Sequence, residues 1–124
     1  WMMIEVMAVS ETGATEALAK HMAALEKEKR SFVMKKHVHE TKKLEKPFPT
    51  IPVGYSTICE LELFADTFEQ LVYLVMNYAP SAVEVFHPEE YKLGAGEAQG
   101  VLNSIADILH KFASQGVGGV IVRG

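Results

Sequence analysis

The order in which strand-like and helix-like segments alternate constrains the fold of this chain more than any other feature. Runs of β-branched and apolar residues predict four strands, over residues 4–9, 32–41, 55–65 and 82–87. Apolar residues at helical spacing predict helices over residues 14–29 and 68–78. The resulting βαββαβ order is typical of the ferredoxin-like plan, an antiparallel sheet with both helices on one face. We therefore expect an α+β fold.

A further helix and strand are expected beyond this unit. An apolar stripe predicts a third helix over residues 97–114, and the run Val-Ile-Val predicts a last strand at residues 120–122. A chain of 124 residues is most simply one domain. We expect residues 1–124 to form that single domain, with a core over about 3–87 and a helix–strand extension over about 94–123.

The segment between the second and third predicted strands is long for a hairpin connection. Residues 42–54 contain Pro47, Pro49 and Pro52. Proline has no backbone N–H to donate to a sheet ladder, so we expect residues 42–54 to be a stiff, unpaired connection. Long loops of this kind often carry function or pack against a partner.

Two predicted helix starts carry recognisable polar residues. Thr12 is the expected N-cap of the first helix, and Thr67 followed by Gln70 fits a capping box at the second. Free N–H groups at a helix start can hold a carboxylate or a phosphate, so Thr12 and Gly13 are candidate ligand-binding residues, with a plain N-cap as the alternative. Residues 9–18 resemble the corresponding turn of ACT-type regulatory domains, which bind amino acids between subunits, but lack the usual proline.

Strand alternation assigns the residues of the predicted sheet to two faces. The helix-covered face should hold Ile4, Val6, Ala8, Phe32, Met34, Val38, Thr57, Cys59, Leu61, Leu63, Val83 and Val85. The second face should hold Met3, Glu5, Met7, Val9, Val33, Lys35, His37, His39, Ser56, Ile58, Glu60, Glu62, Glu84 and Phe86. This second set is too apolar for a solvated surface and too charged for a sealed core. It favours a cleft or a subunit interface, covered by the third helix or by another subunit.

Four residues of the second face could act chemically. His37 and His39 lie two apart on one predicted strand, so their imidazoles share a face with Glu60 and Glu62 of the neighbouring strand. Two histidines and a carboxylate are acceptable ligands for zinc or another divalent transition metal, which makes His37, His39 and Glu60 a candidate metal site. Ordinary cross-strand His–Glu pairs are the alternative. The sequence identifies no other cofactor.

Charge is distributed unevenly along the chain. The net charge is −4, yet residues 20–46 hold nine of the twelve basic residues against four acidic ones. An ordinary solvated surface explains this pattern. The more specific alternatives are a complementary contact between subunits and an anion site on the basic part. A nucleic-acid accessory role through residues 27–46 ranks last because the chain as a whole is acidic.

These features together give the expected location and function. Cys59 is the sole cysteine, and no signal peptide or membrane-spanning run is visible, so we expect a cytoplasmic protein without membrane contact. The leading hypothesis is a homo-oligomeric domain that binds a small ligand or a protein partner through the second sheet face or a subunit interface. The second hypothesis is an enzyme with a His/Glu site between subunits, with or without a metal.

Overall fold

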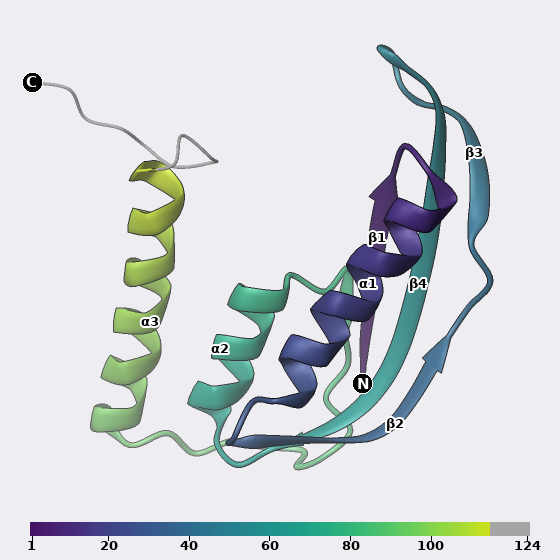
Figure 1. Cartoon of the computed structure of the whole chain (residues 1–124). Coiled ribbons are helices and arrows are strands. Elements are labelled where there is room, and N and C mark those ends of the chain that lie inside the picture. Colours follow the sequence, from purple (N-terminus) through teal and green to yellow (C-terminus); the bar gives the residue numbers. More distant parts are fainter. Residues whose placement is uncertain (115–124) are drawn as a thin grey trace, which may run out of the picture.

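A computed structural model describes residues 1–114, which form an α+β structure (Figure 1). Its elements, in chain order, are β1 (Met2–Ala8), α1 (Glu11–Glu26), β2 (Ser31–Val38), β3 (Lys42–Phe48), β4 (Ile51–Ala65), α2 (Phe68–Tyr78), β5 (Ala82–Val83) and α3 (Ala95–Ser114). The strand expected at residues 120–122 lies outside the described residues.

The five strands form one antiparallel sheet in the order β2-β4-β1-β5, with β3 also paired to β4. The long strand β4 is central, because β1 lies along one of its edges while β2 and β3 follow each other along the other. The α+β class and the antiparallel sheet are confirmed. The strand number and order differ from the four-stranded βαββαβ sheet that the sequence predicts, because β3 is an additional strand.

The prediction that residues 42–54 form an unpaired connection is wrong. They form β3 and the beginning of β4, joined by a tight turn at Pro49 and Thr50. Pro47 falls in the register shift between Glu45 and Phe48, so its missing N–H removes no regular ladder bond. Among the described strands β3 pairs with β4 alone, and edge strands and bulges are the places where a sheet tolerates proline.

The N-cap of the first helix is Ser10, not Thr12. The Ser10 hydroxyl oxygen accepts the Gly13 N–H at 3.0 Å, so α1 begins at Glu11 and ends at Glu26, three residues before each predicted bound. The predicted N-cap at Thr67 is confirmed, because its hydroxyl oxygen accepts the backbone N–H of Gln70 at 3.1 Å.

Two strands are shorter at their C-terminal ends than the sequence predicts. Strand β2 ends at Val38 rather than at residue 41, and β5 covers Ala82–Val83 rather than residues 82–87. In β5, Val83 pairs with Met2. Glu84 continues this contact, because its N–H donates to the Trp1 carbonyl at 2.9 Å and its carbonyl accepts from the Trp1 amino group at 2.8 Å.

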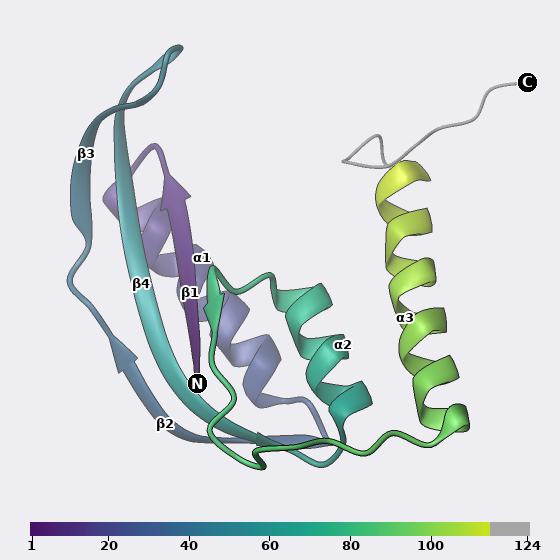
Figure 2. The same ribbon diagram turned by 180° about the vertical axis from the view of Figure 1, so that it is seen from behind.

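Helices α1 and α2 cover one face of the sheet, and the core lies beneath them (Figures 1 and 2). The buried core residues are Met2, Ile4, Leu18, Met22, Leu25, Cys59, Leu61, Leu74 and Tyr78. Of the residues of β1 and β4 predicted to face the helices, Ile4, Cys59 and Leu61 lie in this core, Val6 and Leu63 pack against it, and Thr57 is buried. Helix α3 packs against α2, on the side of α2 away from the sheet, so the expectation that it covers the second face is wrong (Figure 1).

A bulge in β2 reverses part of its predicted alternation. Val33 pairs with Leu63, and Lys35 pairs with Glu62. Leu63 and Glu62 are consecutive, so Met34 is an extra residue that has no partner of its own on β4. As a result Val33 packs against the core, whereas Phe32 and Met34, predicted to lie beneath the helices, are exposed.

Three other valines predicted for the helix-covered core are about half exposed, namely Val38, Val83 and Val85. They lie at or just beyond the ends of β2 and β5, which are the two outer strands of the order β2-β4-β1-β5.

Candidate functional site: the open face of the sheet

The sheet face opposite α1 and α2 carries no helix in the described part of the chain, and we call it the open face (Figure 2). The strand register brings together on it Met3, Glu5, Met7, Phe32, Lys35, His37, Ser56, Ile58, Glu60, Glu62 and Phe64. Except for Phe32 and Phe64, all of these were assigned to this face from the sequence. Its mixture of apolar and charged side chains therefore follows from simple strand alternation.

The two histidines and two glutamates that were predicted to cluster do lie together on the open face. His37 lies opposite Glu60 in the register of β2 and β4. The ring centroids of His37 and His39 are 4.5 Å apart, with the two rings in an edge-on arrangement. His39 Nε2 lies 2.6 Å from Glu60 Oε2, and Lys35 Nζ lies 3.5 Å from Glu62 Oε2. Glu60 therefore fixes the ring of His39, and Glu62 is occupied by a neighbouring cation.

The metal hypothesis gains no support from this arrangement. Within residues 1–114, no three His, Cys, Asp or Glu side chains are grouped closely enough to hold a metal ion. His37, His39 and Glu60 share a face, but Glu60 is engaged by His39 as a hydrogen-bond partner. Cross-strand His–Glu pairing accounts for the geometry that is present.

A second polar pair on the open face involves Glu5 and Ser56. The Ser56 hydroxyl donates to Glu5 Oε2 at 2.6 Å, and Ser56 is buried although it lies on the uncovered side. A hollow of about 230 Å³ adjoins this pair, lined by Met3, His39, Glu40, Lys42, Ser56, Ile58 and Glu60. Sequence alternation placed Glu5 and Ser56 on one face, but it carried no signal for their hydrogen bond.

The candidate turn at Thr12 and Gly13 lies in the first turn of α1. The Gly13 N–H is already bonded to the Ser10 hydroxyl, and a Cβ at position 13 would lie 2.8 Å from the same oxygen. The glycine is thus explained by the close approach of the N-cap side chain. Thr12 and Gly13 are not brought near the His39–Glu60 pair by any described contact.

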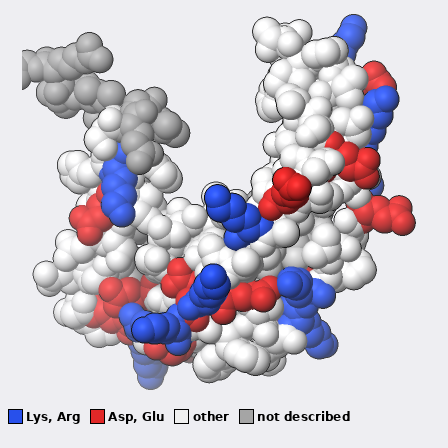
Figure 3. All heavy atoms as spheres, in the orientation of Figure 1, with Lys and Arg blue, Asp and Glu red and all other residues white. Residues whose placement is uncertain are grey.

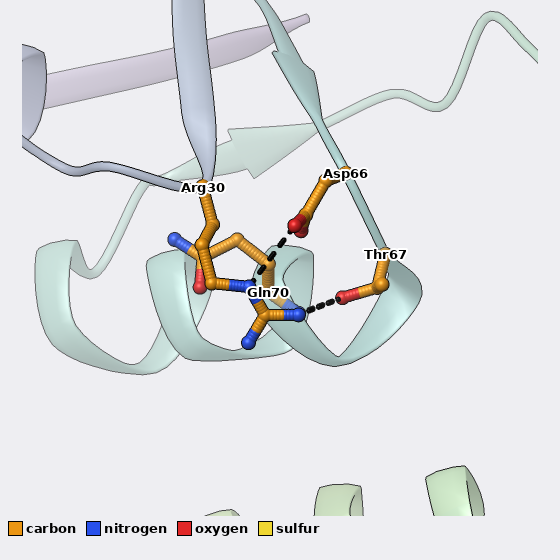
Figure 4. Close-up of polar contacts among 4 residues, drawn as sticks. All are labelled: Arg30, Asp66, Thr67 and Gln70. Atoms are coloured by element: carbon orange, nitrogen blue, oxygen red, sulfur yellow. Dashed lines mark hydrogen bonds and ion pairs between the residues drawn. The ribbon is translucent and has the colours of Figure 1, made fainter.

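Sequence reasoning missed a polar cluster around Arg30, shown in Figure 4. Arg30 Nε donates to Asp66 Oδ2 and Arg30 Nη2 donates to Thr67 Oγ1, both at 3.0 Å. The Asp66 backbone N–H donates to the Arg30 carbonyl at 3.0 Å. Arg30 therefore ties the turn before β2 to the turn between β4 and α2. The only sequence signal was the rarity of arginine, which occurs at two positions in the chain.

A larger cavity of about 570 Å³ lies beside this turn. One wall is the C-terminal end of β4 with Asp66 and Thr67, the other is residues 83–88, and Trp1 and Met2 lie at one end. We call this cavity the slot. Apolar residues form most of its lining, and Glu62, Asp66 and Glu84 are the acidic residues on it, of which Glu62 is paired with Lys35 and Asp66 with Arg30.

The basic stretch 20–46 does not form a surface of one sign. Lys36 Nζ is 2.7 Å from Glu26 Oε1, and this hydrogen bond raises the pKa of Lys36 above its ordinary value. Lys35 is paired with Glu62. Figure 3 shows blue and red groups interleaved along this side of the molecule. Arg30, Lys35 and Lys36 are therefore the basic residues of this stretch that are ion-paired with acidic neighbours.

The comparisons with known proteins identify a family and go no further. The chain belongs to the MJ0538 family, whose family model matches residues 1–123. No curated protein and no solved structure matches the chain. Within residues 1–114, no helix has the length and apolar character needed to cross a membrane.

Proposed function

We propose that this member of the MJ0538 family is a binding domain that pairs with a second copy of itself through the open face. The observation that carries the proposal is a cross-strand pair of phenylalanines. Phe32 and Phe64 are directly paired on neighbouring strands, and 68% and 62% of their surfaces are exposed. Two adjacent aromatic rings facing water are costly for a free monomer and are typical anchors of protein interfaces.

The neighbouring side chains support a self-complementary contact. Met34, two residues after Phe32 on β2, adds a further exposed apolar side chain near the phenylalanines, whereas Met7 is exposed farther along the open face, opposite Ser56. The acidic groups Glu5 and Glu60 lie on the central strands, while Lys35 lies on the outer strand β2. A two-fold axis would bring the basic edge of one copy over the acidic centre of the other, because such a contact places each patch opposite its partner patch.

We also infer that the sheet is of the ferredoxin-like kind with one strand divided in two. Strands β2 and β3 pair with successive parts of one edge of β4, so together they would take the place of a single strand. We further place the protein in a reducing compartment such as the cytoplasm. This proposal is supported by Cys59, the sole cysteine of the sequence, which is a free and buried thiol.

Sedimentation equilibrium at increasing protein concentration tests the self-association. We expect a dimer at tens of micromolar, and we expect the double variant Phe32→Ser, Phe64→Ser to sediment as a monomer with an unchanged circular dichroism spectrum. Leu102→Ser is the matched control, because Leu102 is similarly exposed but lies on α3. A wild-type monomer throughout, or a dimer unaffected by the double variant, contradicts the proposal.

A second candidate function is an enzyme that uses His39 as a general base oriented by Glu60. The 2.6 Å contact between Nε2 and Oε2 beside the hollow of about 230 Å³ favours it. Elemental analysis of untagged protein reports any bound metal. Screening for hydrolytic activity with His39→Gln and His37→Gln then separates a catalytic histidine from its neighbour, and equal activity in all three proteins excludes this candidate.

A further inference from the structure

A groove lies on the helix-covered side of the sheet, along one flank of α1. Helix α1 lies over β1 and β4 and leaves the outer strand β2 to one side (Figure 1). Lys36 and Val38 of β2 share the helix-covered side of the sheet, because they pair with Leu61 and Cys59 of the core. The space between these two residues and α1 forms a cavity of about 210 Å³, which we call the groove.

The deepest residue of the groove, Thr57, lies where β2 gives way to β3. Pairing of β2 with β4 ends at Val38, and pairing of β3 with β4 begins at Lys42. Between these points, residues 39–41 lie opposite residues 57 and 58 of β4, so three residues face two and the regular ladder is interrupted. Thr57 therefore has no paired strand residue on this edge, and its side chain lines the groove.

Thr57 brings a hydroxyl group without a partner to an otherwise apolar lining. The residue is 1% exposed, and its Oγ1 atom has no hydrogen-bond partner within residues 1–114. Much of the remaining lining is apolar, and it includes Leu18, Met22, Ala23 and Val38. Rotation of Thr57 about its Cα–Cβ bond moves the hydroxyl among three staggered positions, which lets it turn toward a molecule in the groove. A hydrogen bond gained there would offset the cost of burying the hydroxyl unpaired.

The other polar groups around the groove are already engaged. Lys36 Nζ lies 2.7 Å from Glu26 Oε1, and both residues line the groove. The Thr15 hydroxyl, also on the lining, donates to the backbone carbonyls of Glu11 and Thr12. A charged ligand would compete with the Lys36–Glu26 ion pair, whereas an uncharged ligand leaves it intact. The groove therefore offers one hydrogen-bonding group in apolar surroundings.

We propose that the groove binds a small, uncharged, mainly apolar molecule that carries one hydroxyl group and is about the size of phenol. Its apolar body lies against Leu18, Met22 and Val38, and its hydroxyl forms a hydrogen bond with the Thr57 hydroxyl. The volume of about 210 Å³ is below the roughly 300–1,000 Å³ of sites for drug-sized ligands, which limits the occupant to a single ring or a short chain.

A titration of isotope-labelled protein with phenol tests the proposal, with toluene as the matched ligand in which a methyl group replaces the hydroxyl. We expect saturable shifts of the amide signals of residues 15–23, Val38 and Thr57 at millimolar phenol. Thr57→Val, which keeps the shape of the side chain, should weaken phenol binding about fivefold, the loss of one hydrogen bond. The same variant should not weaken toluene binding.

A second variant tests the location of the site. Ala23 is an exposed residue of α1 that lines the groove, so Ala23→Leu should fill the groove and abolish the binding of both ligands without disturbing the core. Ala17→Leu is the matched control, because Ala17 is exposed on the same helix and does not line the groove. This control should bind phenol as the wild type does.

Three results would overturn the proposal. These are an absence of saturable shifts at millimolar phenol, shifts that Ala23→Leu leaves unchanged, or equal effects of Thr57→Val on phenol and toluene. The last result would mean that water satisfies the Thr57 hydroxyl and that the groove accepts apolar molecules without selecting a hydroxyl. The outcome is separable from self-association, because Phe32 and Phe64 lie on the open face. The double variant Phe32→Ser, Phe64→Ser should leave phenol binding intact while it abolishes the dimer.

Discussion

The two faces of β4 show how one strand can serve two different environments. Toward the helices, Thr57, Cys59 and Leu61 are at most 1% exposed and belong to a sealed layer. On the open face the strand instead passes from a buried serine at position 56 to Phe64, most of whose surface is in water. The sealed face accounts for stability, whereas the open face retains unsatisfied apolar surface, which is where binding energy is available.

Removing a large side chain from each face should give the strongest contrast. We expect Leu61→Ala to lower the free energy of unfolding by about 3 kcal/mol, because it leaves a cavity in the core. We expect Phe64→Ala to change the stability of the monomer by less than about 1 kcal/mol, because its ring is already exposed. Urea unfolding at low protein concentration measures both, and similar losses in the two variants would contradict the distinction between the faces.

A buried phenol at the C-terminal end of α2 should make the stability of the fold sensitive to alkaline pH. The Tyr78 hydroxyl donates to Glu28 Oε1 at 2.6 Å, and burial, followed by this carboxylate, raises the pKa of Tyr78 above its ordinary value. A raised folded-state pKa stabilises the fold fully below about pH 10, the unfolded value, and the stabilisation declines as pH rises beyond it.

Replacing this phenol tests that dependence. Tyr78→Phe should cost about 1.5 kcal/mol at pH 7, and its difference from the wild type should shrink above about pH 10. Urea unfolding at neutral and alkaline pH measures the difference. Tyr91→Phe is the control, because Tyr91 is exposed and its replacement should leave the free energy of unfolding nearly unchanged. A constant difference across pH would show that Tyr78 ionisation does not contribute.

One polar group on the sealed face should destabilise it. The Thr57 hydroxyl is buried and has no hydrogen-bond partner. Replacing threonine with valine removes the unsatisfied hydroxyl at nearly constant shape, so we expect Thr57→Val to raise the free energy of unfolding by about 1 kcal/mol. Thr57→Ser, which keeps the hydroxyl and loses the methyl group, should lower it. A destabilised valine variant would mean that the hydroxyl does have a partner in solution.

The smallest expected effect belongs to the His39–Glu60 pair on the open face. His39 and Glu60 are each about 40% exposed, so water screens their interaction. We expect His39→Gln to change the free energy of unfolding by less than about 0.5 kcal/mol, and less still at high salt. A loss above about 2 kcal/mol would place this pair in a buried environment and remove the contrast between the faces.

Much of the sheet could be predicted from local sequence patterns. The alternation in residues 55–65 places Cys59 and Leu61 beneath the helices and Glu60 and Glu62 on the open face, because side-chain direction in a regular strand has a period of two. The N-cap at Thr67 is likewise local. Alternation also placed the predicted histidines on one face of their strand and the predicted glutamates on the same face of theirs. Their grouping then followed from the pairing of β2 with β4.

The remaining features depend on pairing between distant segments. The bulge at Met34 has no signal of its own, since one extra apolar residue looks like a continuing strand until β4 fixes its partner. The prolines of residues 42–54 disfavour pairing on both sides of a strand, but they allow β3 at the edge and Pro52 at the start of β4, where β1 does not yet pair. The slot was unpredictable because it exists only through the different lengths over which β1 and β2 pair with β4.

The central position of β4 has a consequence for biosynthesis. Strands β2 and β3 pair with no strand of residues 1–114 other than β4, and β1 otherwise meets only the short β5. During synthesis, residues 1–50 are therefore made before the strand with which β1, β2 and β3 pair. Chaperone dependence during translation should accordingly fall when β4 emerges from the exit tunnel, since its appearance lets three strands pair at once.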